Sequence, residues 1–219
     1  LFLDMLEENE ALENTLVVLV GDHGAPFARA KMSCYDRGLR VPFIVSGPGL
    51  RQGYTSPQPV STVDILPTVL AFAGQEQPEG LPGWNLIPHL QGEPVPDAER
   101  PIFASYNAHQ RDAWFPMRAI RQNDWLLIEN LQADLPRPRP ETDGCPIWPV
   151  EEGQAMQGVE VDAVYQRYLN PPRRELYDLS ADPYCMENLA EKAEFRQQRN
   201  RLARVLRSWR KHTMDSFAE

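Results

Sequence analysis

The hydrophobic pattern at the start of the chain predicts one helix followed by two short strands. Leucines recur among glutamates at near-helical spacing from Leu1 to Leu12, which is typical of an amphipathic helix already under way at the first residue. Leu16–Val20 is a continuous apolar run and indicates a strand buried on both faces, as in a parallel sheet flanked by helices. Pro42–Val45 is the second strand candidate nearby. Because two strands do not complete a doubly wound sheet, we expect the chain to be the C-terminal part of a longer protein.

The rest of the chain divides at residues 94–100, beyond which short strands prevail. Residues 61–74 carry capping residues, an early proline and a terminal glycine, which together predict a helix. A helical apolar stripe predicts a last helix at residues 188–213, capped by Asn188 with Glu191. Partly alternating segments predict antiparallel strands at Ile102–Tyr106, Met117–Arg121 and Trp125–Glu129.

Composition and charge exclude several classes of protein. The 219 residues contain 22 Lys and Arg against 31 Asp and Glu, and this net charge of −9 argues against a nucleic-acid-binding chain. No apolar run approaches the roughly 18 residues of a membrane span, and we expect no secretory leader within these residues. Three widely spaced cysteines, Cys34, Cys145 and Cys185, give neither a disulfide framework nor a metal knuckle. The cellular compartment is therefore not predicted.

Candidate chemistry concentrates at Gly21-Asp22-His23-Gly24, directly after the first predicted strand. In open α/β sheets, ligands bind at the carboxyl ends of the strands. A carboxylate beside an imidazole suits a divalent cation such as Ca²⁺, although Ca²⁺ prefers oxygen ligands. The other interpretation is a plain strand-to-loop turn, in which Asp22 caps backbone N–H groups and His23 lies at the surface. The four residues alone favour this second interpretation.

Further motifs follow in a fixed order along the chain. Lys31 stands four residues before Tyr35, and then come an acidic residue, Gly, Arg and Val-Pro. The later motifs are Val63–Thr68, the G-x-x-L-x-P-x-L pattern of Gly83–Leu90, and an ELYDL-x-x-DP tail with Asn-Leu in Arg174–Leu189. In this order the chain resembles the sulfatase family of the alkaline-phosphatase-like superfamily, and the resemblance covers essentially its whole length.

The resemblance implies an α/β fold with two parts. Residues 1–97 would be the C-terminal part of the alkaline-phosphatase-like sulfatase core. Residues 98–219 would form a small α+β subdomain with a short antiparallel sheet and a packing C-terminal helix. By its length and its place in the family, the Pro-rich loop 131–173 would lie over the pocket and shape specificity.

The resemblance also implies roles for individual residues. Asp22 and His23 would coordinate a Ca²⁺ ion that holds the sulfate oxygens, and Lys31 would add a positive charge to the same group. A preplaced cation and an ammonium stabilise the negative charge that develops when a sulfate ester is cleaved. His109 would contact the sugar or the leaving-group oxygen, and Arg118 would bind substrate. A solvated Lys31 and an exposed His109 are the structural alternatives.

Within the family, two segments are similar to the heparan N-sulfatase (sulfamidase) branch. His109-Gln110 stands where that branch has His-Glu, and Phe115–Arg118 stands where it has Tyr-Pro-Met-Arg. Three positions depart from the branch, with His23 for Asn, Lys31 for a frequent Arg and Gln110 for Glu. We therefore expect hydrolysis of a sulfate ester or an N-sulfate on a sulfated sugar. Another sulfated sugar than that of the branch is an open alternative.

The nucleophile of the family has no counterpart in these residues. Sulfatases use a formylglycine made from Cys or Ser in a C-x-[PA]-x-R context, and none of the three cysteines stands in that context. The family's Asp-Asp metal pair is also absent from the sequence. Both features belong to the N-terminal half of these enzymes. We therefore expect the 219 residues alone to be inactive, with the N-terminal half of the same protein as their partner.

Two other interpretations stay open. Phosphonate and phosphate monoester hydrolases of the same superfamily share Asp-His-Gly and a metal. A non-catalytic binding remnant is the third possibility, suggested by the arginines of the last predicted helix, although such a charge run is usually a solvated face. We expect an oligosaccharide or small-molecule sulfate as substrate and neither nucleic acid nor membrane as partner. The sequence predicts neither the oligomeric state nor the localisation.

Overall fold

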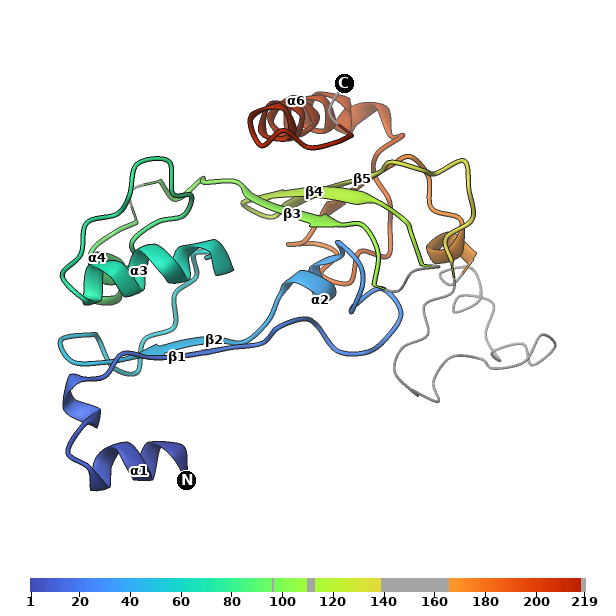
Figure 1. Ribbon diagram of the computed structural model, residues 1–219. Helices are drawn as coiled ribbons and strands as arrows, with labels where there is room; N and C mark the ends of the chain where they lie inside the picture. Colours follow the sequence, from blue (N-terminus) through green and yellow to red (C-terminus); the bar gives the residue numbers. More distant parts are fainter. Residues whose placement is uncertain (96, 110–112, 139–165, 218–219) are drawn as a thin grey trace. The chain divides into compact units, whose positions relative to one another are not determined.

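The computed structural model describes residues 1–95, 97–109, 113–138 and 166–217, which form two compact units (Figure 1). The first unit comprises Leu1–Gly21 and Pro42–Ile102, and the second comprises Asp22–Val41 and Phe103–Glu219. Residues 22–41 thus belong to the same unit as the C-terminal half of the chain. All five predicted site residues therefore belong to the second unit.

The first unit begins with α1 (Phe2–Glu8), a 3-10 turn at Leu12–Asn14 and a two-stranded sheet. Strands β1 (Val17–Val20) and β2 (Phe43–Ser46) confirm the two predicted strands, but they pair antiparallel, with Leu19 opposite Ile44. The expectation of a doubly buried parallel strand is thus wrong for the described residues. β2 is the single described neighbour of β1, and 55% of Leu19 and 59% of Ile44 are exposed.

The helix predicted at residues 61–74 is present as a 3-10 turn (Thr62–Asp64) and α3 (Ile65–Phe72). Ser61 and Asp64 form a capping box, which satisfies free N–H groups at the start of the helical segment. The buried Asp64 carboxylate also accepts hydrogen bonds from the Trp84 backbone N–H, at 2.8 Å, and from the Arg100 guanidinium. These bonds hold the segment that leads to α4 (Ile87–Leu90) against α3.

The second unit is built on a four-stranded sheet in the order β3-β4-β5-β6. The β4–β5 and β5–β6 pairs are antiparallel. The three strands predicted beyond residue 100 are confirmed, and β6 adds the segment that the sequence showed only as a motif. The bounds are β3 (Ile102–Tyr106), β4 (Met117–Gln122), β5 (Trp125–Asn130) and β6 (Arg174–Asp178).

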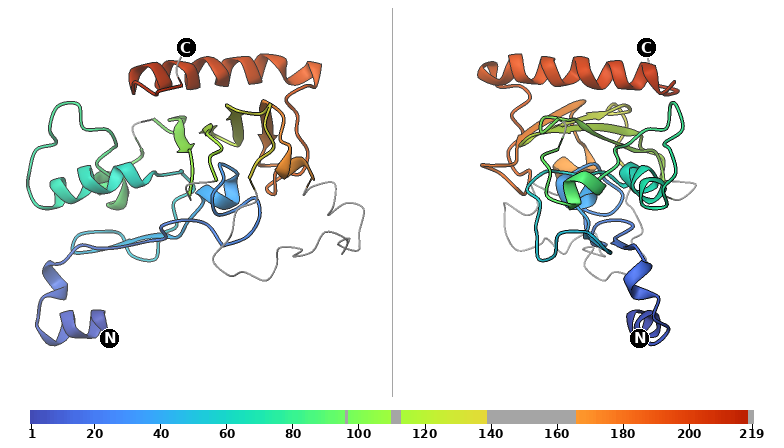
Figure 2. Two further views of the ribbon diagram at one scale, coloured as in Figure 1. Left: turned by 45° about the vertical axis from the view of Figure 1, so that its right-hand side comes forward. Right: turned by 90° about the vertical axis from the view of Figure 1, so that its left-hand side faces the viewer.

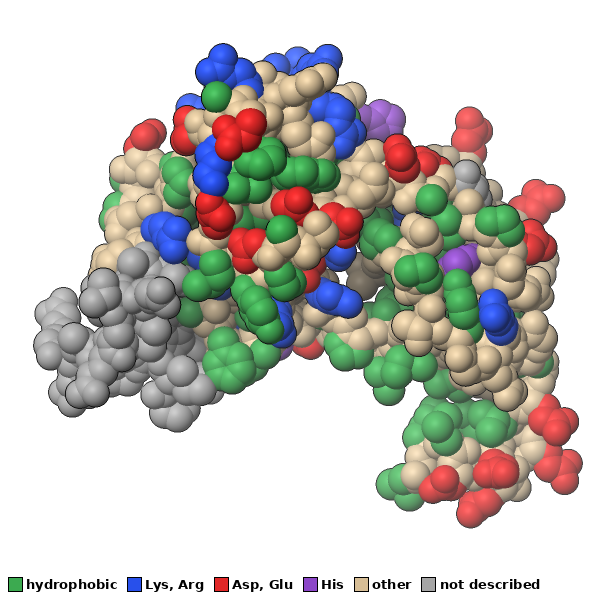
Figure 3. Space-filling view, turned by 180° about the vertical axis from the view of Figure 1, so that it is seen from behind, with side chains coloured by type: hydrophobic (Ala, Val, Ile, Leu, Met, Phe, Trp, Pro, Cys, Tyr) green, Lys and Arg blue, Asp and Glu red, His purple; other side chains and the backbone are tan. Residues whose placement is uncertain are grey.

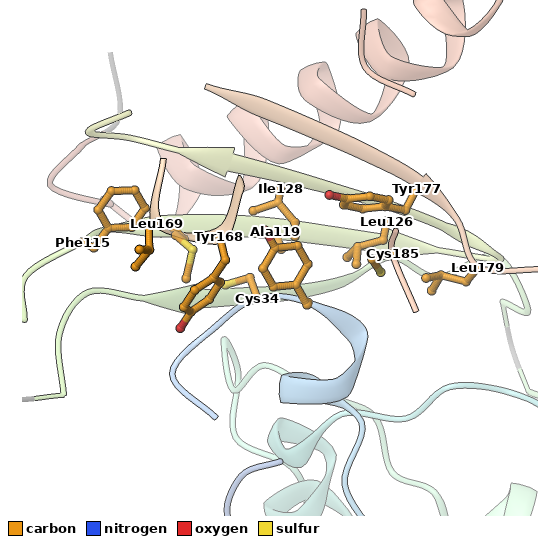
Figure 4. Close-up of a cluster of buried hydrophobic side chains, with 12 residues drawn as sticks. Cys34, Phe115, Ala119, Leu126, Ile128, Tyr168, Leu169, Tyr177, Leu179 and Cys185 are labelled. Atoms are coloured by element: carbon orange, nitrogen blue, oxygen red, sulfur yellow. The ribbon is translucent and has the colours of Figure 1, made fainter. Parts of the chain in front are cut away.

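Successive residues of this sheet face two different hydrophobic clusters. Ile120, Leu127 and Leu176 pack with α6 (Arg196–His212), which lies along one face of the sheet in both views of Figure 2. Their neighbours Ala119 and Leu126 point to the opposite face, where Figure 4 shows them clustered with Cys34 above α2 (Asp36–Leu39). The sheet therefore separates the last helix from the segment 22–41, which carries the Asp-His-Gly motif and Lys31.

The last helix begins later than the sequence predicts. Asn188 does not cap it, because the Asn188 side chain accepts from the backbone N–H of Leu176 and donates to the carbonyl of Arg174, which fixes the chain beside β6. A 3-10 turn (Ala193–Phe195) precedes α6, whose start is Arg196. Lys and Arg side chains gather over α6 in Figure 3. No helix in the described part of the chain is long and apolar enough to cross a membrane.

Candidate functional site

The structure brings the side chains of Asp22 and His23 together. Nε2 of His23 lies 3.4 Å from Oδ2 of Asp22, and Nδ1 of His23 lies 2.7 Å from the carbonyl oxygen of Gly24. Because a carbonyl only accepts, Nδ1 carries the proton of this hydrogen bond. In the neutral imidazole, Nε2 therefore directs a lone pair toward the carboxylate. Two electron-pair donors that face each other in this way are suited to a shared cation.

Both side chains are open to solvent, with 87% of the Asp22 side chain and 41% of the His23 side chain exposed. A bound ion or substrate group can therefore reach them. No third His, Cys, Asp or Glu joins them to make a metal-binding group among the residues that the structure describes. The pair is thus part of a ligand set at most.

Two glycines shape the loop that follows. The N–H of Gly24 donates to the carbonyl of Gly38 at 3.3 Å, so the two ends of the segment lie together. A Cβ atom on Gly24 would lie 2.0 Å from the carbonyl oxygen of Arg37, and one on Gly38 would lie 2.2 Å from that of Ala30. Since backbone atoms are in the way in both cases, only glycine fits at either position. This close approach is what the glycines of the motif provide.

Lys31 lies inside this loop and is buried, with 8% of its surface exposed. Its backbone N–H donates to the carbonyl of Ala25 at 3.0 Å. Arg29 and Met32, on either side of it, both have φ of 63°, a left-handed conformation that costs a residue with a Cβ free energy. Strained residues of this kind cluster at functional sites and persist where the surroundings hold them.

The surroundings of the Lys31 loop come from distant parts of the second unit. The Tyr35 hydroxyl donates to Oε2 of Glu175 at 2.8 Å, and the Arg29 guanidinium donates to the carbonyl of Cys185 and lies 4.2 Å from the centroid of the Tyr35 ring. On the other side, the Arg137 guanidinium donates to the carbonyl of Met32. The loop is therefore tied down on both sides of Lys31.

The other two predicted substrate residues lie apart from this loop in the sequence and differ from each other in burial. His109 is exposed, three residues beyond β3. Arg118 is 4% exposed and forms an ion pair with Asp215 at 2.7 Å, and it also donates to Oδ1 of Asn107 at 2.8 Å. Gln110 lies outside the described residues. Arg118 thus has a structural task, and we leave it out of the proposed site.

The buried thiols are poor nucleophiles. Burial raises the pKa of Cys34 to about 12 and that of Cys185 to about 11, so both are protonated near neutral pH. Cys145 and most of the Pro-rich loop 131–173 lie outside the described residues, so the predicted role of that loop in specificity stays a prediction. Among the described cysteines, none is activated for catalysis.

Sequence reasoning gave no role to Glu175 or Arg137. Glu175 stands in the ELYDL motif, so the motif marked the residue, but nothing local to it indicated a contact with Tyr35, 140 residues away. Arg137 lies in a Pro-rich stretch with no recognisable motif. Only the three-dimensional structure connects either residue with Lys31.

Comparisons with known proteins identify a matching family model and several relatives. Residues 1–75 match the family model "Sulfatase". The chain is 29% identical to the N-sulphoglucosamine sulphohydrolase of Homo sapiens over 231 residues, which cover 99% of this chain and 45% of that protein. It is 37% identical to arylsulfatase K of Homo sapiens over 196 residues, covering 85% of the chain and 30% of that enzyme. A ulvan-active sulfatase of Formosa agariphila is 29% identical, over 94% of the chain and 39% of the relative. The chain thus spans less than half of the length of each relative.

Solved structures show the same fold. One is a protein in complex with its substrate D-glucosamine-2-N,6-O-disulfate, with a TM-score of 0.71 and 25% identity over 98% of this chain and 37% of the other. A phosphonate monoester hydrolase from Silicibacter pomeroyi has a TM-score of 0.67 and 21% identity over 98% and 38%. The family recognition is confirmed: the chain is a sulfatase-family sequence of the alkaline-phosphatase-like superfamily, and its structure corresponds to the C-terminal portion of the sulfatase fold.

Proposed function

We propose that this chain is the C-terminal portion of a sulfatase that hydrolyses a sulfate ester or an N-sulfate of a sulfated sugar. The observation that carries the proposal is the pairing of Asp22 Oδ2 with His23 Nε2 at 3.4 Å, in the same segment as the buried Lys31. These residues belong to the motif through which the chain resembles the sulfatases. The relatives and the glucosamine disulfate complex support a sulfated sugar as the substrate class.

A Ca²⁺ ion fits the Asp22–His23 pair. Oδ2 of Asp22 and Nε2 of His23, which lie 3.4 Å apart, would be two of its ligands. The proton that Nδ1 donates to Gly24 leaves Nε2 free to be a ligand. Further oxygen ligands would come from the rest of the full-length protein. When bound, the ion supplies positive charge to the sulfate oxygens.

Lys31 supplies the second charge in this proposal. Its ammonium binds a sulfate oxygen and is held there by a loop whose backbone is fixed by Ala25, Gly24 and Gly38. A charge that is in place before the reaction needs no reorganisation as negative charge develops on the leaving oxygen. His109, which is exposed, contributes to sugar binding in this scheme.

The nucleophile comes from outside these 219 residues. None of the three cysteines stands in a formylglycine motif, and the described thiols have raised pKa values. We therefore assign the formylglycine, like the remaining metal ligands, to the N-terminal half of the full-length protein. The first experiment is to read the coding sequence upstream of Leu1. A continuous frame with an Asp-Asp pair and a C-x-[PA]-x-R or S-x-[PA]-x-R motif supports the proposal, and a start codon at Leu1 contradicts it.

The Lys31 contribution is tested in the full-length protein by measuring sulfate release from N-sulfated and 6-O-sulfated glucosamine. We expect Lys31→Ala to lower kcat/KM on the order of 100-fold, because one positive charge on the transition state is lost. Lys31→Arg keeps the charge and should lose less. Equal activity of Lys31→Ala and the wild type would remove Lys31 from the site. A higher rate on phenylphosphonate than on either sulfate would favour the phosphonate hydrolase alternative.

The metal prediction is tested by calorimetric titration of the same protein with Ca²⁺. We expect Asp22→Asn to weaken Ca²⁺ binding at least about tenfold, because a charged ligand becomes a neutral one. Asp134→Asn is the matched control, since Asp134 is an exposed aspartate of the same unit outside the motif. Equal Ca²⁺ affinity of the two variants would contradict the assignment of Asp22 as a ligand.

A further inference from the structure

The loop that carries Lys31 is anchored to residues that come more than a hundred positions later in the chain. Its Tyr35 bonds to Glu175, its Met32 carbonyl to Arg137 and its Arg29 to the carbonyl of Cys185, at separations of 140, 105 and 156 residues. The hydrogen bonds within the loop are therefore supplemented by three hydrogen bonds to distant parts of the chain. Glu175 belongs to the ELYDL motif of β6.

Glu175 is the centre of one of these anchors. Only 3% of its surface is exposed, and its carboxylate accepts three hydrogen bonds. The Tyr35 hydroxyl donates to Oε2 at 2.8 Å, the Tyr177 hydroxyl to the same oxygen at 2.5 Å, and Nδ2 of Asn130 to Oε1 at 2.8 Å. Hydrogen bonds to a buried carboxylate are stronger than neutral ones. Tyr177 and Asn130 lie on the sheet, so Tyr35 is the donor that connects this carboxylate with the Lys31 loop.

The backbone of the loop shows why such anchors are needed. Arg29 and Met32 each have φ of 63°, and the strain lies immediately on either side of Ala30 and Lys31. Without external bonds, a segment of this kind relaxes to ordinary φ values, and the direction of the Lys31 side chain changes with it. The two remaining anchors act at the strained residues themselves, on the Arg29 side chain and the Met32 carbonyl.

We propose that Glu175 is a positioning residue for Lys31. Glu175 holds Tyr35, and Tyr35 holds the strained loop in the one conformation that directs the Lys31 ammonium to the sulfate. Glu175 itself touches no substrate. The role of Lys31 rests on the function proposed above, whereas the anchoring of the loop does not.

Two side-chain donors to Glu175 allow a matched test in the full-length protein. Tyr35→Phe and Asn130→Ala each remove one hydrogen bond to the Glu175 carboxylate, but only Tyr35 lies in the Lys31 loop. Amide hydrogen exchange of residues 25–38 is measured first, at a temperature where both variants are folded. We expect Tyr35→Phe to speed exchange in this segment about tenfold, and Asn130→Ala to change it less than threefold.

Steady-state kinetics on the sulfated sugar is the second measurement. We expect Tyr35→Phe to lower kcat about tenfold with KM within twofold, because a displaced Lys31 loses interactions that are strongest in the transition state. Asn130→Ala should keep kcat within threefold. Equal effects of the two variants, in exchange or in kcat, would overturn the proposal. If no sulfated sugar is hydrolysed, the proposed function fails, while the exchange difference alone still supports or overturns the anchoring.

Discussion

At the scale of single residues, the loop after the Asp-His-Gly motif depends on the absence of two Cβ atoms. Gly24 and Gly38 approach neighbouring backbone so closely that a methyl group would overlap carbonyl oxygens at 2.0 and 2.2 Å. A flexible side chain can move away from such an overlap, but a hydrogen-bonded backbone cannot without losing the loop. The positions of Asp22, His23 and Lys31 therefore depend on glycines that do no chemistry.

This dependence gives a prediction for Gly38→Ala. Its methyl group would displace Ala30, the neighbour of Lys31, and we expect a loss of about 3 kcal/mol in the free energy of unfolding. Gly53→Ala is the control, because a Cβ atom at Gly53 meets no other atom within 4 Å. Its φ of +64° is left-handed, and holding an alanine in this conformation costs about 1 kcal/mol. Urea unfolding of the two variants measures the difference. A loss for Gly38→Ala no larger than for Gly53→Ala would show that the loop adapts.

At the scale of elements, the end of α6 is fixed to the sheet by a buried ionic network. Asp215 accepts from Arg118 at 2.7 Å and from Arg210 at 2.9 Å, and Arg210 also reaches Glu129 of β5 at 3.2 Å. Burial alone would raise the pKa of Asp215. The hydrogen bonds from Arg118 and Arg210 outweigh this effect and lower that pKa from 3.8 to about 2. The network thus holds the helix and two strands together, and it accounts for the burial of Arg118.

The direction of this pKa shift predicts a pH dependence of stability. Since the folded-state pKa lies below the unfolded value, the contribution of Asp215 is complete above about pH 4 and is lost as the pH falls toward 2. We expect Asp215→Asn to cost on the order of 3 kcal/mol at pH 7, with the difference from the wild type shrinking between pH 4 and 2.

Urea unfolding across this pH range tests the prediction. Glu187→Gln is the control, because Glu187 forms an exposed pair with Lys192 and such pairs contribute little. A loss for Asp215→Asn that stays the same at pH 7 and pH 2 would mean that its carboxylate charge does not stabilise the fold.

The sequence predicts the existence of elements better than their pairing. Strands β3, β4 and β5 follow from short alternating segments, and the turn and helix after Ser61 from its capping box, because these signals lie within a few residues. The partner and direction of β1 depend on which strand meets it, and the apolar run carries no information about that. The predicted start of the last helix is wrong because the Asn188 side chain accepts a hydrogen bond from the Leu176 backbone N–H of β6 and does not cap a helix.

At the scale of the whole molecule, the proposed function requires that the nucleophile come from outside the 219 residues. We therefore expect the isolated chain to release no sulfate from p-nitrophenyl sulfate, with or without added Ca²⁺. The control is the full-length protein at the same concentration and purity. Turnover by the isolated chain that persists through further purification and is abolished by Lys31→Ala would contradict the assignment of the nucleophile to another segment.

Some residues of the candidate site could be predicted from neighbouring residues in the sequence, whereas the contacts that support them could not. Asp22, His23 and Lys31 stand close together in the sequence, so a family motif identifies all three. The anchoring of the Lys31 loop by Glu175 and Arg137 was not predictable, because it depends on contacts between segments more than a hundred residues apart. The candidate residues are thus found from a local motif, whereas the contacts that fix the Lys31 loop are seen only in the structure.

The bond between Tyr35 and Glu175 also has a consequence for the order of folding during synthesis. A ribosome adds on the order of ten residues per second, so the loop with Lys31 waits roughly ten seconds or more before the strand that anchors it has been made. Until then, the Tyr35 and Arg29 side chains of the loop lack their partners Glu175 and Cys185. The loop can therefore reach the conformation described above only after the chain has passed residue 185 and β6 has joined the sheet.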